Sequence, residues 1–165
     1  IRNKKTELLY LPIRAKDIIQ IVKALKKMGW KPEMMGSDGL LSTVLKQYKK
    51  ESGLLEGMLA TDFYSIFMPL TSYGEKVAKT FRSLFGGRAT TYTALGAEGY
   101  ALLLNAINRC KTPGNRACIN RMIRNTVDFT GIMGKISIKS NGKALRPLVV
   151  NAIKDSRLEI IVKVY

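Results

Sequence analysis

The apolar positions of the first 62 residues predict short strands that alternate with helices. Apolar residues from Lys16 to Met28 recur at helical spacing, and Gly29 follows where a helix commonly ends. Two parallel strands joined by a crossover helix are the simplest arrangement of this order. The predicted segments are strands at 7–12 and 32–35, helices at 16–28 and 40–48, and a turn at 36–39.

The rest of the chain predicts one more strand, then helices, then hairpins. Residues 57–63 form the strand, and an irregular apolar connection at 66–70 follows it. Asn141-Gly142 is a typical hairpin turn, and two apolar runs flank a polar turn at 154–157. The predicted helices are 73–85, 93–108 and 117–126, and the strands are 135–138, 148–153 and 158–164.

The composition describes a globular chain with an unusual charge. The 165 residues suffice for one domain or two small lobes, and 46% apolar with 24% charged residues excludes disorder. No histidine is present, which excludes triads, zinc sites and acid–base chemistry that depend on imidazole.

The 28 basic and 12 acidic residues leave two interpretations open. A charge of +16 is typical of proteins that bind nucleic acid or another anionic surface, but it also suits a solvated positive surface. Basic runs never exceed two residues, and the aromatic residues are not interleaved with basic ones, so the solvated surface is favoured. Residues 63–165 carry most of the excess, with 16 basic and 5 acidic side chains.

Two cysteines, Cys110 and Cys118, lie on either side of a loop between predicted helices. They could form a disulfide, remain two separate thiols, or supply half of a metal site. Because the chain has no other Cys or His, the metal site is the weakest alternative, and we predict a disulfide in an oxidising compartment.

Residue patterns that support catalysis are scarce. Asp38 and Asp62 could act as paired carboxylates, but nothing in the sequence brings them together. The turn around Asp38 lacks the spacing of a nucleophile elbow, and Gly86-Gly87-Arg88 does not match a phosphate-binding loop. We therefore predict no enzyme, no metal and no cofactor.

Asp38 and Arg14 suggest a receptor for a zwitterion. Ligands of open α/β sheets bind beyond the carboxyl ends of strands, where both turns are expected. A carboxylate suits an ammonium group, and a guanidinium suits a carboxylate. The alternative, favoured by spacing alone, is that Asp38 caps the helix that starts near Leu40 while Arg14 points into water.

The order of several segments resembles the type I periplasmic binding proteins of the branched-chain amino acid group, the solute receptors of ABC importers. The resemblance implies parts of two Rossmann-like α/β lobes: the second lobe at 1–62, the first at 63–146, and a hinge and return hairpin at 147–165. Since family members are much longer, it covers only their C-terminal part. The segments are Leu9–Pro12, Leu25–Gly29, Met35–Gly39, Leu55–Met58, Ala94–Gly96 and Asp128–Ile138.

The resemblance also implies a ligand site. Asp38 falls on the acidic position that binds the ligand's ammonium group, Arg14 on or beside a position often held by Tyr, and Tyr92 near an aromatic residue of the first lobe. Arg14, together with Ala97 where a Tyr often follows Leu-Gly, argues against an apolar branched-chain ligand and opens the alternative of an acidic or otherwise anionic one.

These observations predict a non-catalytic solute-binding protein, periplasmic or extracellular and tethered to a membrane. It closes its lobes on an amino acid or a similar small zwitterion and delivers this ligand to the membrane subunits of an importer. We expect no nucleic-acid partner. The chain starts at Ile1 without a signal peptide, so we expect a processed chain or a fragment. Such a fragment should bind ligand weakly or not at all by itself, and should associate or swap elements with a second copy.

Overall fold

The structure, a computed structural model, describes residues 6–65, 67–68 and 70–164, and the chain divides into two compact units. The described residues of unit 1 lie within 6–63 and 148–164, and those of unit 2 within 64–147. The assignment of these units to the second and first lobes of a receptor stays a prediction.

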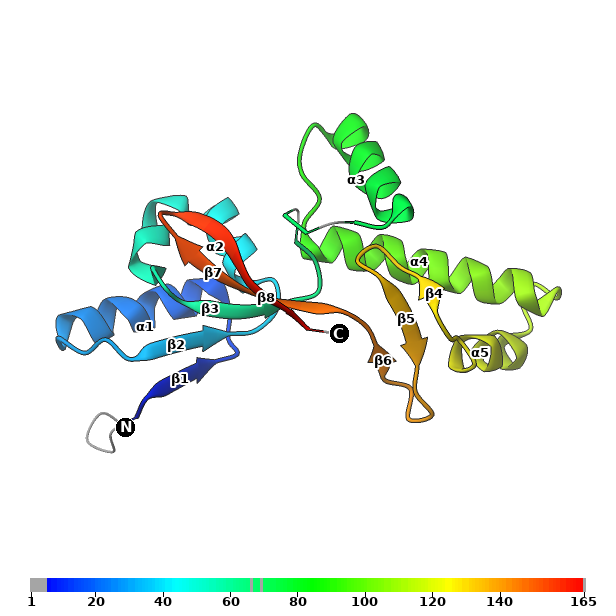
Figure 1. The fold of residues 1–165 in the computed structure, drawn as a ribbon, viewed down its shortest axis with the longest axis horizontal. Helices are drawn as coiled ribbons and strands as arrows, with labels where there is room; N and C mark the ends of the chain where they lie inside the picture. Colours follow the sequence, from blue (N-terminus) through cyan, green and yellow to red (C-terminus); the bar gives the residue numbers. More distant parts are fainter. Residues whose placement is uncertain (1–5, 66, 69, 165) are drawn as a thin grey trace. The chain divides into compact units, whose positions relative to one another are not determined.

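Unit 1 is an α/β layer built on one five-stranded sheet (Figure 1). The strand order is β1-β2-β3-β7-β8, in which β1, β2 and β3 are parallel and β7 and β8 run antiparallel to their neighbours. The elements are β1 (Leu8–Leu11), α1 (Ala15–Lys27), β2 (Glu33–Gly36), α2 (Leu40–Gln47), the 3₁₀ helix η2 (Lys49–Leu55), β3 (Leu59–Asp62), β7 (Leu148–Lys154) and β8 (Arg157–Val164).

The core of unit 1 lies between the sheet and its helices. Gly29 follows α1 with a φ of 63°, a left-handed conformation that glycine adopts without strain, so it ends the helix as predicted. The buried apolar cluster contains Ala15, Ile18, Val22, Leu40, Leu41, Val44, Leu55, Met58, Ala60 and Ile153.

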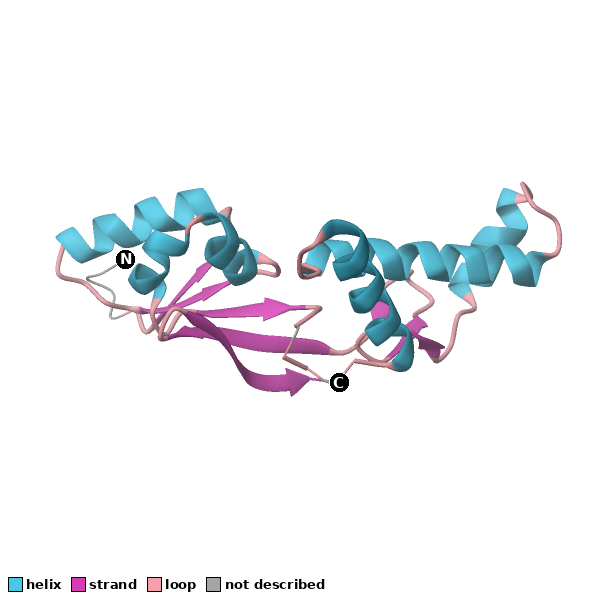
Figure 2. Cartoon of the chain, turned by 90° about the horizontal axis from the view of Figure 1, so that it is seen from above, coloured by secondary structure: helices cyan, strands magenta, loops and turns pink. Residues whose placement is uncertain are grey.

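The helices of unit 1 lie on one side of the sheet (Figure 2). Leu11 and Met34 pack against the core cluster, and the alternation of a strand turns their neighbours Tyr10 and Met35 to the opposite face. Tyr10 is 55% exposed there. Unit 1 therefore leaves an apolar sheet face uncovered, as expected for a partial α/β layer. Association of this face with a second copy of the chain stays a prediction.

Unit 2 combines three helices with a small antiparallel sheet. Its sheet has the order β4-β5-β6. The elements are α3 (Ser72–Phe85), α4 (Thr91–Cys110), α5 (Arg116–Arg124), β4 (Phe129–Thr130), β5 (Lys135–Ile138) and β6 (Ala144–Leu145). No helix in the described part of the chain is long and apolar enough to cross a bilayer.

The predicted helices and strands are confirmed, with shifts of up to two residues at most ends. The sequence pattern missed η2 and the two-residue strands β4 and β6, which are too short to produce periodicity. The helix predicted at 73–85 leaves apolar side chains open at its end, because Leu84 and Phe85 are about 70% exposed. Ile66 and Pro69, part of the predicted apolar connection, lie outside the described residues.

Candidate ligand-binding site

The turns that carry Arg14 and Asp38 lie at one edge of the unit 1 sheet. Strands β1 and β2 pair in parallel, with Leu11 opposite Gly36. The residues directly after these two partners therefore leave the sheet side by side, as Figure 1 shows. The prediction that the two turns follow neighbouring parallel strands is confirmed.

Asp38 is exposed in the turn between β2 and α2. The N-cap of α2 is Gly39, which has a φ of 69°, and no side chain caps the helix by a hydrogen bond. The Ser42 and Thr43 hydroxyls instead donate to the Gly39 carbonyl, at 3.0 and 2.7 Å. The capping role considered for Asp38 is therefore wrong, and its carboxylate is open to solvent near the positive end of a helix.

Arg14 is the N-cap residue of α1 by position, and its side chain is 86% exposed. Its Nε donates to Oδ2 of Asp17 at 2.9 Å, one helical turn further on. The alternative in which Arg14 points into water agrees with this geometry. Because exposed ion pairs contribute little free energy, the guanidinium can exchange Asp17 for another anion at small cost.

Tyr92 belongs to unit 2, whereas Asp38 and Arg14 belong to unit 1. It is the second residue of α4 and is 62% exposed. The preceding Thr90 caps the helix by accepting a hydrogen bond from the Thr93 amide. The role of Tyr92 in ligand binding stays a prediction.

Asp62, weighed above as a partner of Asp38, ends β3 and is only 4% exposed. Its Oδ1 accepts a hydrogen bond from the Phe63 amide at 2.8 Å. Asp62 is the last residue of β3, and Asp38 comes shortly after the neighbouring strand β2. The Asp62 carboxylate is buried and hydrogen-bonded to the next amide, whereas Asp38 is exposed. These different environments do not resemble a catalytic pair.

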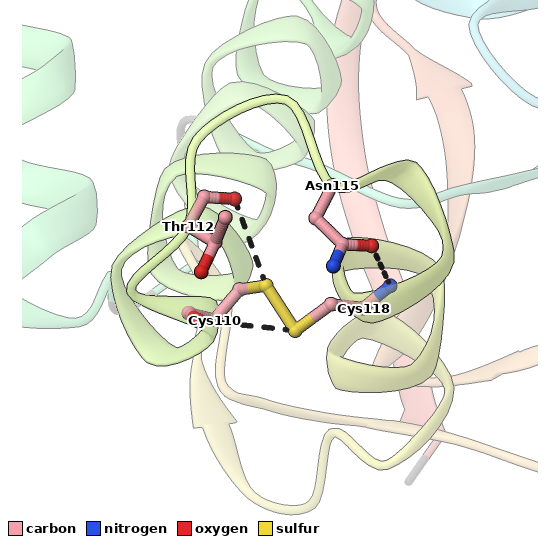
Figure 3. Close-up of a disulfide and its surroundings, with 4 residues drawn as sticks. All are labelled: Cys110, Thr112, Asn115 and Cys118. Carbon is pink, nitrogen blue, oxygen red and sulfur yellow. Dashed lines mark hydrogen bonds between the residues drawn. A yellow bond between two sulfur atoms is a disulfide. The ribbon is translucent and has the colours of Figure 1, made fainter.

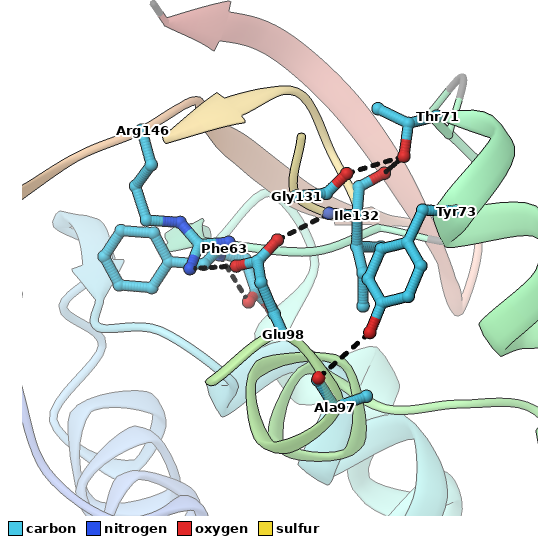
Figure 4. A network of polar contacts seen from close by, with 9 residues as sticks. Phe63, Thr71, Tyr73, Ala97, Glu98, Gly131, Ile132 and Arg146 are labelled. Atoms are coloured by element: carbon cyan, nitrogen blue, oxygen red, sulfur yellow. Dashed lines mark hydrogen bonds and ion pairs between the residues drawn. The ribbon is translucent and has the colours of Figure 1, made fainter. Parts of the chain in front are cut away.

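A buried carboxylate, Glu98 of α4, organises the centre of unit 2 (Figure 4). Its Oε2 accepts a hydrogen bond from the Ile132 amide at 2.5 Å, and its Oε1 lies 2.5 Å from Nη1 of Arg146. The Gly131 amide donates to the Gly134 carbonyl at 2.8 Å, which closes the turn that Glu98 holds. Sequence reasoning missed this network, although the turn belongs to Asp128–Ile138, one of the segments that carry the resemblance.

Thr71 and Tyr73 tie α3 to the same turn and to α4 (Figure 4). The Thr71 hydroxyl donates to the Gly131 carbonyl at 2.6 Å and accepts from the Gly74 amide at 3.1 Å. The Tyr73 hydroxyl donates to the Ala97 carbonyl at 3.0 Å. Burial raises the pKa of Tyr73 above its ordinary value of 10.0, and the negative charge of Glu98 raises it further.

Cys110 and Cys118 form the predicted disulfide, which joins the end of α4 to the start of α5 (Figure 3). Their Cα atoms are 5.9 Å apart, and Asn115 in the enclosed loop accepts a hydrogen bond from the Cys118 amide. A metal role is excluded for these two sulfurs, because both are engaged in the bond. No group of three or more potential ligands for a metal occurs among the described residues.

Comparison with known proteins identifies the family of this chain. The model of the periplasmic binding protein family matches residues 1–157. No curated protein matches the chain.

Three solved structures similar to the chain are solute- or substrate-binding proteins. A leucine-binding protein of Thermotoga maritima is 24% identical with a TM-score of 0.83, and the match covers 96% of this chain and 44% of that one. A branched-chain amino acid transporter substrate-binding protein of Streptococcus pneumoniae, in complex with isoleucine, is 16% identical with a TM-score of 0.75 over 97% and 46% of the two chains. An ABC transporter substrate-binding protein of Desulfitobacterium hafniense, in complex with Leu, is 18% identical with a TM-score of 0.75 over 97% and 45%.

The chain thus spans less than half the length of these structures while nearly all of it is matched. Their α/β fold agrees with the predicted class, parts of a type I periplasmic binding protein. Because the family model matches almost every residue, the chain belongs to the periplasmic binding protein family and has the fold of the substrate-binding proteins of amino-acid ABC transporters.

Proposed function

We propose that this chain is the ligand-recognising C-terminal part of a non-catalytic receptor that captures an amino acid, or a similar small zwitterion, for an ABC importer. The receptor closes two lobes on the ligand and delivers it to the membrane subunits. The disulfide supports a periplasmic or other extracytoplasmic location, because such bonds persist in oxidising compartments.

The observation that carries the proposal is the exposed carboxylate of Asp38 beyond the carboxyl end of β2. This carboxylate does not cap the helix that follows, because Gly39 is the N-cap residue and no side chain caps α2 by a hydrogen bond. A ligand ammonium group would place a positive charge and three hydrogen-bond donors beside the Asp38 carboxylate.

Arg14 supports a preference for anionic ligands. It follows the neighbouring strand β1 and is held only by an exposed ion pair with Asp17. A ligand carboxylate could replace Asp17 and accept two parallel hydrogen bonds from the guanidinium. We therefore propose that acidic amino acids bind better than branched-chain ones. Tyr92 is proposed as a contact from the other lobe.

A ligand-observed NMR screen of the twenty common amino acids against the 165-residue chain tests this function. Since the chain covers only 44% of the leucine-binding protein that it matches, we expect weak binding in the millimolar range, strongest for aspartate and glutamate. Asp38→Ala should abolish the saturation-transfer signal.

Glu33→Gln is the matched control, because it removes an exposed carboxylate at the amino end of the same strand. It should leave binding unchanged. Absence of a signal for all twenty amino acids, or an equal loss in both variants, would refute the proposed site.

A further inference from the structure

One end of unit 2 carries a concentrated positive charge. Residues 111–127 and 138–145 contain six basic side chains and no Asp or Glu. All six are exposed, and none forms a salt bridge among the described residues. We define this set as the cationic tip: Lys111, Arg116, Arg121, Arg124, Lys139 and Lys143.

The cationic tip is fixed by covalent and hydrogen bonds. The disulfide and the Asn115 cap hold the loop that carries Lys111 against the start of α5 (Figure 3). Arg124 Nη1 lies 3.5 Å from the Ser140 carbonyl, which brings the end of α5 to the turn between β5 and β6. In that turn the amide of Lys139 donates to the carbonyl of Lys143 at 2.8 Å.

The charge of this tip is not neutralised from within the described chain. The nearest carboxylate in sequence, Asp128, lies within 3.5 Å of the Ser137 hydroxyl rather than with a cation of the tip. Six like charges on a rigid surface repel one another. A multivalent anion that spans them neutralises this repulsion, and its binding also releases counterions.

Apolar side chains beside the cations indicate what kind of anion fits. Val127 is 74% exposed next to the end of α5, and Leu145 is 51% exposed two residues after Lys143. The two segments contain no aromatic residue on which a nucleic-acid base could stack. Exposed cations with interspersed apolar side chains are typical of surfaces that bind the interface of an anionic bilayer.

We propose that the cationic tip of unit 2 docks on the surface of an anionic phospholipid bilayer. The cations bind lipid phosphates, while Val127 and Leu145 enter the boundary of the acyl region. Such docking would keep a receptor at the membrane that holds its importer, and it does not depend on the ligand site of unit 1.

Co-sedimentation of the 165-residue chain with lipid vesicles tests the proposal. The chain should bind vesicles of phosphatidylcholine with 30% phosphatidylglycerol at 100 mM salt, should not bind pure phosphatidylcholine, and should lose at least tenfold in affinity at 400 mM salt. No binding to the anionic vesicles at 100 mM salt would overturn it.

Two double variants with the same total charge separate the tip from the net charge. Arg116→Glu with Arg121→Glu should lower vesicle affinity at least tenfold, because both side chains lie on α5 in the tip. Lys23→Glu with Lys27→Glu, on α1 of unit 1, should change it less than threefold. Equal losses would overturn the proposal, and circular dichroism verifies that both variants fold.

Two further measurements address the partner. Val127→Ser keeps the charge and should weaken binding to anionic vesicles, because it removes an exposed apolar group. A 20-base-pair DNA duplex should bind more weakly than the anionic vesicles at the same salt. Tighter binding to DNA would overturn the assignment to lipid.

Discussion

Glu98 Oε1 and Arg146 Nη1 form a buried ion pair in unit 2, with a separation of 2.5 Å and side chains that are only 3% and 14% exposed. The pair joins α4 to the residue that follows β6. The second oxygen of Glu98 holds the turn at Ile132. A single side chain thereby connects a helix, a turn and the end of a small sheet.

Glu98→Ala should lower the free energy of unfolding by about 3 kcal/mol, because it leaves the buried Arg146 charge without this partner. Glu98→Gln should cost less, since the amide oxygen can still accept from Ile132. Urea denaturation measures both. Equal stabilities of Glu98→Ala and the unaltered chain would show that the network does not hold unit 2.

Two helical glycines provide a matched test of how closely α3 packs on the turn at Ile132. A Cβ at Gly74 would lie 2.5 Å from the Ile132 carbonyl oxygen, whereas a Cβ at Gly99 of α4 meets nothing within 4 Å. Gly74→Ala should therefore destabilise unit 2 by about 1–3 kcal/mol, and Gly99→Ala should stabilise it by about 0.5–1 kcal/mol. Thermal unfolding that ranks Gly74→Ala as the more stable variant would contradict the packing.

Tyr73 predicts a loss of stability at alkaline pH. Its folded pKa is raised by burial and by Glu98, so the unfolded chain ionises first as the pH rises above 10. The stability that Tyr73 contributes is complete below that pH and is lost as the pH rises through its folded pKa. Tyr73→Phe should flatten the fall in unfolding free energy between pH 9.5 and 11 in urea titrations.

Tyr100→Phe controls for the removal of a tyrosine, because Tyr100 is 65% exposed on α4. At pH 8, Tyr73→Phe should cost about 1 kcal/mol through loss of the hydrogen bond to Ala97. Identical pH profiles for the two variants would mean that the environment of Tyr73 does not affect stability.

The uncovered sheet face of unit 1 predicts association with a second copy. Tyr10 is exposed on that face, and β1 is an edge strand. Sedimentation velocity should detect concentration-dependent dimers that Tyr10→Lys weakens by placing a charge on the face. Tyr100→Lys adds the same charge on α4 and should leave the dimer intact; a monomer at all concentrations would contradict the expectation.

The sequence predicted the parts of the fold that rest on local patterns. The helical spacing in α1, the glycine that ends it and the turn between β7 and β8 all involve residues close in the chain. The disulfide could also be predicted from the sequence, because only a short loop separates its two cysteines. Asp38 and Arg14 were placed at one edge of the sheet because parallel strands end on the same side.

The parts that were missed depend on contacts between distant residues. Glu98 lies in a helix whose sequence shows nothing unusual, and its partners Ile132 and Arg146 come from segments that meet only in the folded unit. Asp38 was weighed as a helix cap because its position before Leu40 suits one, but Gly39 adopts the left-handed conformation and begins the helix instead.

The most direct test of the central claim is a two-dimensional ¹⁵N–¹H NMR titration of the 165-residue chain with glutamate. We expect the largest chemical-shift changes in the turns at 12–15 and 36–39, saturating in the millimolar range, and absent in Asp38→Asn. Glutamate-induced shifts that persist unchanged in Asp38→Asn, or that occur only outside these two turns, would contradict the account.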